Sequence, residues 1–124
     1  MNIGQWKGAS IMIRPNRGEI WFADLATDIN QKDNERSQVL IISDNALNQG
    51  ASKLLMVIPL IAATQNIASQ IAIFPKELGL KTNVAVRCET ILSISHKRLV
   101  SYFGTVTPET MAKVDQALRF LLSL

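Results

Sequence analysis

An arginine and a glutamate two residues apart are the side chains of this sequence best suited to chemistry. Arg87 and Glu89 follow the run at 83–86, which reads as a buried strand. Residues i and i+2 of a strand point to the same face, so the guanidinium and the carboxylate are expected side by side. A cation beside a potential general base predicts a site directed at a phosphate. On spacing alone, a structural ion pair is the favoured alternative.

The composition indicates one folded domain with a mildly basic surface. The chain has 124 residues, of which 48% are hydrophobic and 19% are charged, so disorder is not expected. Its formal net charge is +3, and residues 1–17 carry three basic side chains and no acid. This balance leans towards an anionic partner, although mild basicity is common among globular proteins.

A single cysteine and a single histidine limit the possible chemistry. Cys88 and His96 allow no internal disulfide and no His/Cys metal site, and no metal or cofactor is expected. Alternation turns Cys88 away from Arg87 and Glu89, which favours a buried apolar role over a nucleophilic one. His96 is expected in a surface turn. We expect a cytoplasmic protein, because cysteine usage fits a reducing compartment and no apolar run approaches about 20 residues.

Short apolar or alternating runs predict a mainly β domain. Strands are expected at 18–25, 38–43, 54–61, 70–74, 84–88 and 98–103, with a shorter apolar segment at 91–94. Pro59 within the third run argues for an edge strand or a bulge. The polar stretch at 26–36 is expected to be an exposed loop, and Asp44 to begin a turn or short helix.

The last element is predicted to be a helix. Thr107 suits the N-cap and Pro108 the first helical position. Its helical-spaced apolar stripe, either core packing or a dimer contact, consists of Met111, Val114, Leu118, Leu121 and Leu122. Many strands followed by one helix predict a small antiparallel barrel or half-open sheet capped by that helix. Residues 1–16 are expected to be an N-terminal extension, and residues 17–124 the domain.

Several motifs resemble the MazF/PemK/Kid family of toxins. They are Arg-Gly-Glu-Ile-Trp-Phe-Ala-Asp-Leu at 17–25, Val-Leu-Ile-Ile-Ser at 39–43, Val-Ile-Pro-Leu at 57–60 and Val-Arg-Cys-Glu at 86–89. Their order and spacing, together with the closing helix, extend the resemblance over about residues 17–124. The resemblance implies an SH3-like barrel related to CcdB, a homodimer and a cognate antitoxin. It also implies metal-independent, sequence-specific cleavage of single-stranded RNA by an endoribonuclease.

The resemblance also suggests roles for individual residues. Glu89 becomes the candidate general base and Arg87 the phosphate anchor and charge stabiliser. Arg36 becomes a second phosphate contact, with a solvated loop charge as an equal alternative. The further candidate RNA-binding residues are Arg17, Lys32, Ser37, Thr64 and Gln65.

Two positions depart from the family pattern and leave a second function open. Ser37 and Gln38 stand where the family has Arg-Pro, and Arg36 lies one residue early. Ile61 replaces the threonine that follows Pro-Leu. A family member that binds antitoxin or RNA without cutting is therefore the alternative. A gyrase poison of the CcdB type is disfavoured, because that class acts through an aromatic C-terminal tail and this chain ends in a predicted helix.

Overall fold

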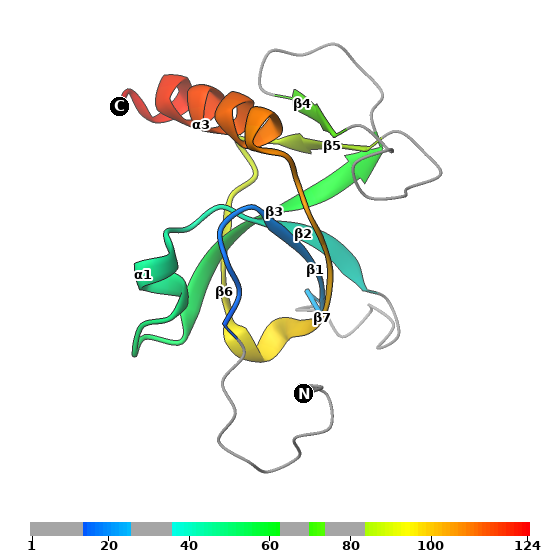
Figure 1. The fold of residues 1–124 in the computed structure, drawn as a ribbon, viewed down its shortest axis with the longest axis vertical. Coiled ribbons are helices and arrows are strands. Elements are labelled where there is room, and N and C mark those ends of the chain that lie inside the picture. The colour runs from blue at the N-terminus through cyan, green and yellow to red at the C-terminus, as the bar shows by residue number, and fades with distance from the viewer. Residues whose placement is uncertain (1–13, 26–35, 63–69, 74–83) are drawn as a thin grey trace.

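A computed structural model describes residues 14–25, 36–62, 70–73 and 84–124. Most of the expected N-terminal extension and of the polar loop at 26–36 therefore lies outside the described residues. The described residues form a curved antiparallel sheet with one long helix against it (Figure 1). The predicted mainly β architecture with a C-terminal helix is confirmed.

Seven strands account for the sheet. They are β1 (Glu19–Ala23), β2 (Ser37–Ile41), β3 (Leu54–Ala62), β4 (Gln70–Ile73), β5 (Val84–Arg87), β6 (Leu92–Ser95) and β7 (Leu99–Thr105). Their order is β4-β5-β3-β2-β1-β7, and β6 also pairs with β3. Each predicted strand is present with its ends shifted by no more than two residues.

The strand β3 is central rather than at an edge, so the edge position suggested by Pro59 is wrong. One side of β3 pairs with β2, and the other pairs first with β6 over 54–57 and then with β5 over 60–62. Pro59 lies between these two segments and is paired with neither β6 nor β5. A proline lacks the N–H that a ladder requires, so the chain tolerates it at this interruption.

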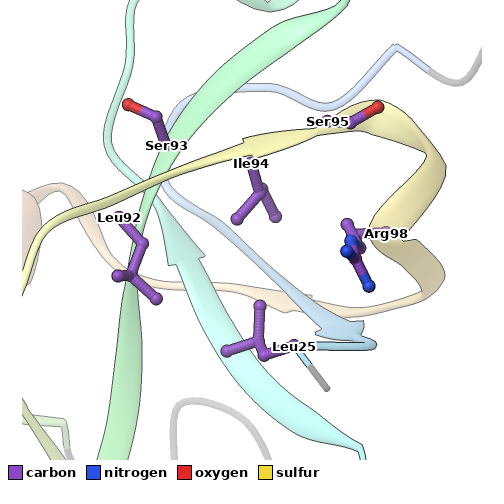
Figure 2. A pocket seen from close by; sticks show the side chains of 6 residues that line it. All are labelled: Leu25, Leu92, Ser93, Ile94, Ser95 and Arg98. Carbon is purple, nitrogen blue, oxygen red and sulfur yellow. The ribbon is translucent and has the colours of Figure 1, made fainter. Parts of the chain in front are cut away.

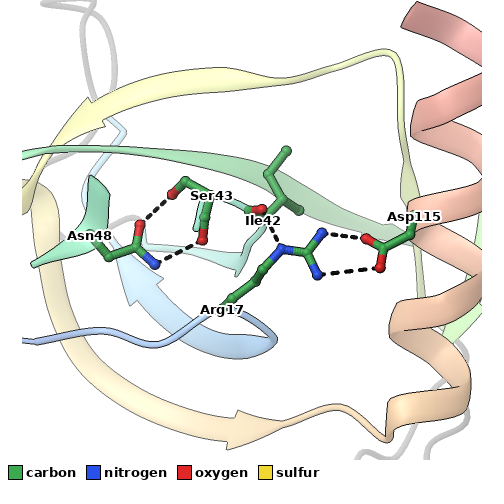
Figure 3. A network of polar contacts seen from close by, with 5 residues as sticks. All are labelled: Arg17, Ile42, Ser43, Asn48 and Asp115. Carbon is green, nitrogen blue, oxygen red and sulfur yellow. Dashed lines mark hydrogen bonds and ion pairs between the residues drawn. The ribbon is translucent and has the colours of Figure 1, made fainter. Parts of the chain in front are cut away.

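A buried polar network fixes the connection between β2 and β3. The short helix α1 (Asn45–Asn48) is capped by Asp44, as expected, and Asn48 is fully buried. The Nδ2 of Asn48 donates to the backbone oxygen of Ser43 at 2.9 Å, and the Ser43 hydroxyl donates to Oδ1 of Asn48 (Figure 3). The backbone N–H of Met56 donates to the same hydroxyl at 2.9 Å. These contacts satisfy buried polar groups that would otherwise destabilise the turn.

The helix α3 (Pro108–Leu122) begins as predicted. Thr107 is its N-cap, and its hydroxyl accepts a hydrogen bond from the backbone N–H of Thr110 at 3.2 Å. Val114 is fully buried in a core cluster formed with the sheet, which confirms core packing for the first part of the apolar stripe. Towards the C-terminus the helix emerges, and Phe120 is 81% exposed. No helix in the described part of the chain is long and apolar enough to cross a membrane.

Cys88 and His96 are both buried, but the sequence predicted this only for Cys88. Cys88 is fully buried in the cluster that contains Val114, as predicted. Burial, aided by the negative charge of Glu89, raises the pKa of the Cys88 thiol from 9.0 to about 11. The surface position expected for His96 is wrong. It lies in the 3-10 helix η2 (His96–Arg98), where its side chain is buried. Its backbone N–H donates to the backbone oxygen of Lys53 at 3.0 Å.

The contribution of α3 to stability can be tested by shortening its buried valine. We expect Val114→Ala to lower the free energy of unfolding by about 2 kcal/mol, because it leaves a cavity between helix and sheet. Phe120→Ala should change it by less than about 0.5 kcal/mol, since that ring is largely in solvent. Denaturant unfolding measures both, and equal effects would contradict this packing.

The thiol of Cys88 should be inert in the folded protein. With its pKa near 11, only about 0.1% of the thiol is ionised at pH 8. We expect alkylation by iodoacetamide to be at least about 100-fold slower in the native protein than in denaturant, where the thiol is solvated and more acidic. Mass spectrometry measures both rates, and rapid native modification would show that Cys88 is not buried.

Candidate functional site

Arg87 and Glu89 lie at the end of β5, where the chain turns. Arg87 is the last residue of the strand, and the next two residues form the turn. The backbone N–H and the hydroxyl of Thr90 both donate to the backbone oxygen of Arg87, at 3.0 and 2.8 Å. Glu89 is therefore placed by a closed turn rather than by continued strand alternation, a distinction that the spacing did not reveal.

The predicted proximity of the two side chains is confirmed. The Nη2 of Arg87 donates to Oε2 of Glu89 at 3.0 Å. The side chains are 43% and 39% exposed, so solvent or a ligand reaches both. An ion pair this exposed contributes at most about 1 kcal/mol to folding, which makes stability alone a weak reason for it.

The arginine retains hydrogen-bonding capacity that Glu89 does not use. The Nε of Arg87 is buried and has no hydrogen-bond partner among the described residues. A buried donor without an acceptor is unfavourable by about 1–3 kcal/mol, and more when the group is charged. This cation is thus incompletely compensated, a condition that an anionic ligand oxygen would relieve if the side chain shifted towards it.

Ile61, at the position where the resemblance leads us to expect a threonine, lies on the same side of the sheet as Arg87. Ile61 of β3 pairs with Ala85 of β5. Ala85 and Arg87 are two residues apart on one strand and so share a face. Ile61 therefore points to the Arg87 side, where it is partly buried and offers no hydrogen-bond donor.

Strand registers also decide which residue at the start of β2 lies on that side. Val39 pairs with Pro59, and both Ser37 and Ile61 lie two residues from these partners on their own strands. Ser37 consequently shares the face of Ile61, whereas the preceding position, Arg36, belongs by alternation to the opposite face. Arg36 is exposed just before β2. Its contact with a scissile phosphate stays a prediction, and it requires a bulge at this point.

The side chain of Arg17 contacts the backbone just after β2 and the helix α3. Its Nε donates to the backbone oxygen of Ile42 at 2.8 Å, and its Nη1 and Nη2 donate to the two carboxylate oxygens of Asp115 on α3 (Figure 3). Its side chain is 32% exposed. The predicted RNA contact of Arg17 therefore competes with an existing carboxylate. Three other candidate RNA contacts, Lys32, Thr64 and Gln65, lie outside the described residues.

A shallow pocket that the sequence analysis missed begins three residues after Glu89. Its volume is about 360 Å³, and β6 forms one wall (Figure 2). The lining residues are Leu25, Leu92, Ser93, Ile94, Ser95 and Arg98. All except Leu25 belong to residues 92–98, in β6 and η2, and folding brings Leu25, which lies two residues after β1, against them. Among the described residues, acidic, histidine and cysteine side chains form no group of three suited to a metal.

Comparisons with known proteins identify the family of this chain. A family profile described as a PemK-like, MazF-like toxin of type II toxin–antitoxin systems matches residues 16–122. The chain is 31% identical over 113 residues to the endoribonuclease MazF9 of Mycobacterium tuberculosis, covering 87% of this chain and 96% of that protein. It is 28% identical over 110 residues to the endoribonuclease EndoA of Bacillus subtilis, covering 87% and 94%.

Solved structures show the same fold. A mycobacterial endoribonuclease, determined in complex with its cognate antitoxin, superposes with a TM-score of 0.73 at 28% identity, covering 89% of this chain and 96% of that one. A MazE–MazF structure from Deinococcus radiodurans gives a TM-score of 0.76, covering 90% and 99%, but at 17% identity it supports the fold alone. From the profile match and the relative above 30% identity, we conclude that this chain belongs to the PemK-like, MazF-like toxin family of type II toxin–antitoxin systems.

Proposed function

We propose that this protein is a metal-independent endoribonuclease toxin that cleaves single-stranded RNA. The observation that carries the proposal is the accessible Arg87–Glu89 pair at the end of β5, joined at 3.0 Å. Two relatives that cover most of the chain are named endoribonucleases, and a solved relative is in complex with its cognate antitoxin. The proposed partners are accordingly single-stranded RNA, a cognate antitoxin and a second copy of the chain, acting in the cytoplasm. Residues 17–124 form the proposed toxin domain.

Glu89 is the proposed general base. Its carboxylate takes the proton of the ribose 2′-hydroxyl, and the 2′-oxygen attacks the adjacent phosphorus. The bond from phosphorus to the 5′-oxygen breaks, the 5′-oxygen takes a proton from water, and the hydroxide that remains takes the proton held by Glu89. The products are a 2′,3′-cyclic phosphate and a 5′-hydroxyl end. The carboxylate must leave Arg87 to act, and its 39% exposure leaves room for that movement.

Arg87 is the proposed anchor for the scissile phosphate. A guanidinium remains charged throughout the physiological pH range, so it donates hydrogen bonds rather than a proton. Negative charge grows on the phosphate oxygens as the 2′-oxygen attacks, and a fixed cation at that point lowers the barrier. The uncompensated Nε supports this role, because an oxygen of the phosphate would supply the missing acceptor.

A second function, RNA or antitoxin binding without cleavage, is favoured by one observation. The positions occupied by Ser37 and Ile61 lie on the Arg87 face, where the family carries an arginine and a threonine. Losing one donor to a transition state commonly lowers a rate by about 100- to 1000-fold. A protein lacking both would still attract RNA through its basic residues, with an affinity that falls as salt rises.

The general base is tested with the isosteric amide. We expect Glu89→Gln to slow cleavage of a long single-stranded RNA in EDTA by about 10²- to 10⁴-fold, because the amide accepts no proton. Binding of a 2′-deoxy oligonucleotide should persist. Glu109→Gln, an exposed acid at the start of α3, is the charge-matched control and should cleave normally.

Either of two results would decide against this assignment. Equal cleavage by wild type and Glu89→Gln would remove Glu89 from the chemistry. Intact RNA with a large excess of wild-type protein would exclude the nuclease and favour binding without cleavage.

The threonine that the family carries at the position of Ile61 can be restored by mutation. We expect Ile61→Thr to raise the cleavage rate by about 10- to 100-fold, since it places a hydroxyl donor on the Arg87 face without changing the branching at Cβ. Ile61→Val is the matched control, because it shortens the side chain without adding a hydroxyl. Single-turnover rates measure both, and equal rates for the two variants would show that this position takes no part in the reaction.

A further inference from the structure

The turn at Arg17 and Gly18 joins several elements at one point. The backbone N–H of Arg17 donates to Oδ1 of Asn45 at 2.7 Å, and that of Gly18 donates to the backbone oxygen of Ile41 at 2.9 Å. The N–H of Val106 donates to the backbone oxygen of Gly18 at 3.0 Å. Gly18 has a φ of +91°, a conformation that favours glycine. The turn is therefore held from β2, from α1 and from the end of β7.

The helix α3 rests on this turn through two residues on one helical face. A Cβ added to Gly18 would lie 3.4 Å from Cγ of Met111, so the backbone of the turn closely approaches the helix. Four residues later, Asp115 receives the two terminal nitrogens of Arg17. Residues i and i+4 of a helix are neighbours on its surface, so the turn contacts one continuous strip of α3.

The docking of α3 is mechanically linked to the candidate site. Val114, the residue before Asp115, packs in the same buried cluster as Val86 and Cys88. These two residues flank Arg87 in sequence, and Cys88 also precedes Glu89. A shift of the helix would therefore be transmitted to the end of β5 through close-packed side chains.

We propose that Arg17 and Asp115 are positioning residues for the Arg87–Glu89 site, an inference that rests on the proposed ribonuclease function. In this role Arg17 does not contact RNA. Its charge fixes α3 against the sheet, and the helix in turn fixes the end of β5. The guanidinium and carboxylate are 32% and 33% exposed and meet through two hydrogen bonds, a geometry stronger than a single-point surface pair.

The test compares the two partners and uses Glu109→Gln as the charge-matched control on the same helix. We expect Arg17→Gln and Asp115→Asn each to lower kcat for RNA cleavage by about 10- to 100-fold, since small displacements of reacting groups have effects of this size. The double variant should be no slower than either single variant, because both remove one interaction. Affinity for a 2′-deoxy oligonucleotide should not change, and Asp115→Glu should recover most of the rate.

A direct RNA contact by Arg17 gives a different pattern. Arg17→Gln alone would then weaken oligonucleotide binding and reduce its salt dependence, while Asp115→Asn would leave cleavage intact or tighten binding. That pattern would overturn the proposal. An unchanged kcat in Asp115→Asn would overturn it as well.

Amide hydrogen exchange tests the link between α3 and the end of β5 without relying on RNA cleavage. We expect faster exchange of the amides at 86–90 in Asp115→Asn than in wild type and in Glu109→Gln. If wild type cleaves no RNA, the ribonuclease proposal fails, but faster exchange would still support the mechanical link. Unchanged exchange at 86–90 would overturn the link whether or not wild type is active.

Discussion

The burial of alternate residues at the end of β5 is the constraint on which the candidate site depends. Val86 and Cys88 are fully buried in the cluster between the sheet and α3. Because Val86 points inward, Arg87 beside it in β5 is directed outward into partial contact with solvent. The turn that follows, closed by Thr90, buries Cys88 and leaves Glu89 at the surface next to Arg87. The hydrophobic effect thus places two charged groups side by side. Their mutual attraction is too weak to do so alone, because water screens an exposed ion pair.

Features that depend on local periodicity were predictable from the sequence. The strands, the Thr107 cap and the burial of Cys88 each follow from residues within a few positions of one another. The contacts of Arg17 and the burial of His96 could not be predicted in this way, because distant segments build their surroundings. Asp115 lies 98 residues from Arg17, and a charged side chain near a chain end gives no local sign of such a partner. The pocket beside β6 combines residues 92–98 with Leu25, and the later segment alone did not indicate it.

Comparing motifs alone left the altered positions ambiguous, and strand pairing resolves one part of that ambiguity. In a linear alignment, Arg36 stands one residue before the family arginine position, close enough to be taken as its replacement. In the sheet, a one-residue displacement exchanges one face for the other, so Ser37 rather than Arg36 lies on the side of Ile61 and Arg87. The chemical identity of a residue is therefore less informative here than the parity of its position along the strand.

The interruption of pairing at Pro59 has a further consequence for the specificity of the fold. Residues 54–57 and 60–62 of β3 pair with different strands, and of the two residues between them, Ile58 and Pro59, the second has no N–H. If β5 or β6 slid along β3 to cover this gap, a ladder bond would fall on a nitrogen that cannot donate. The proline thereby acts against slippage of either neighbour. A one-residue slip of β5 would turn Val86 outward and Arg87 inward, so this resistance helps keep the guanidinium at the surface.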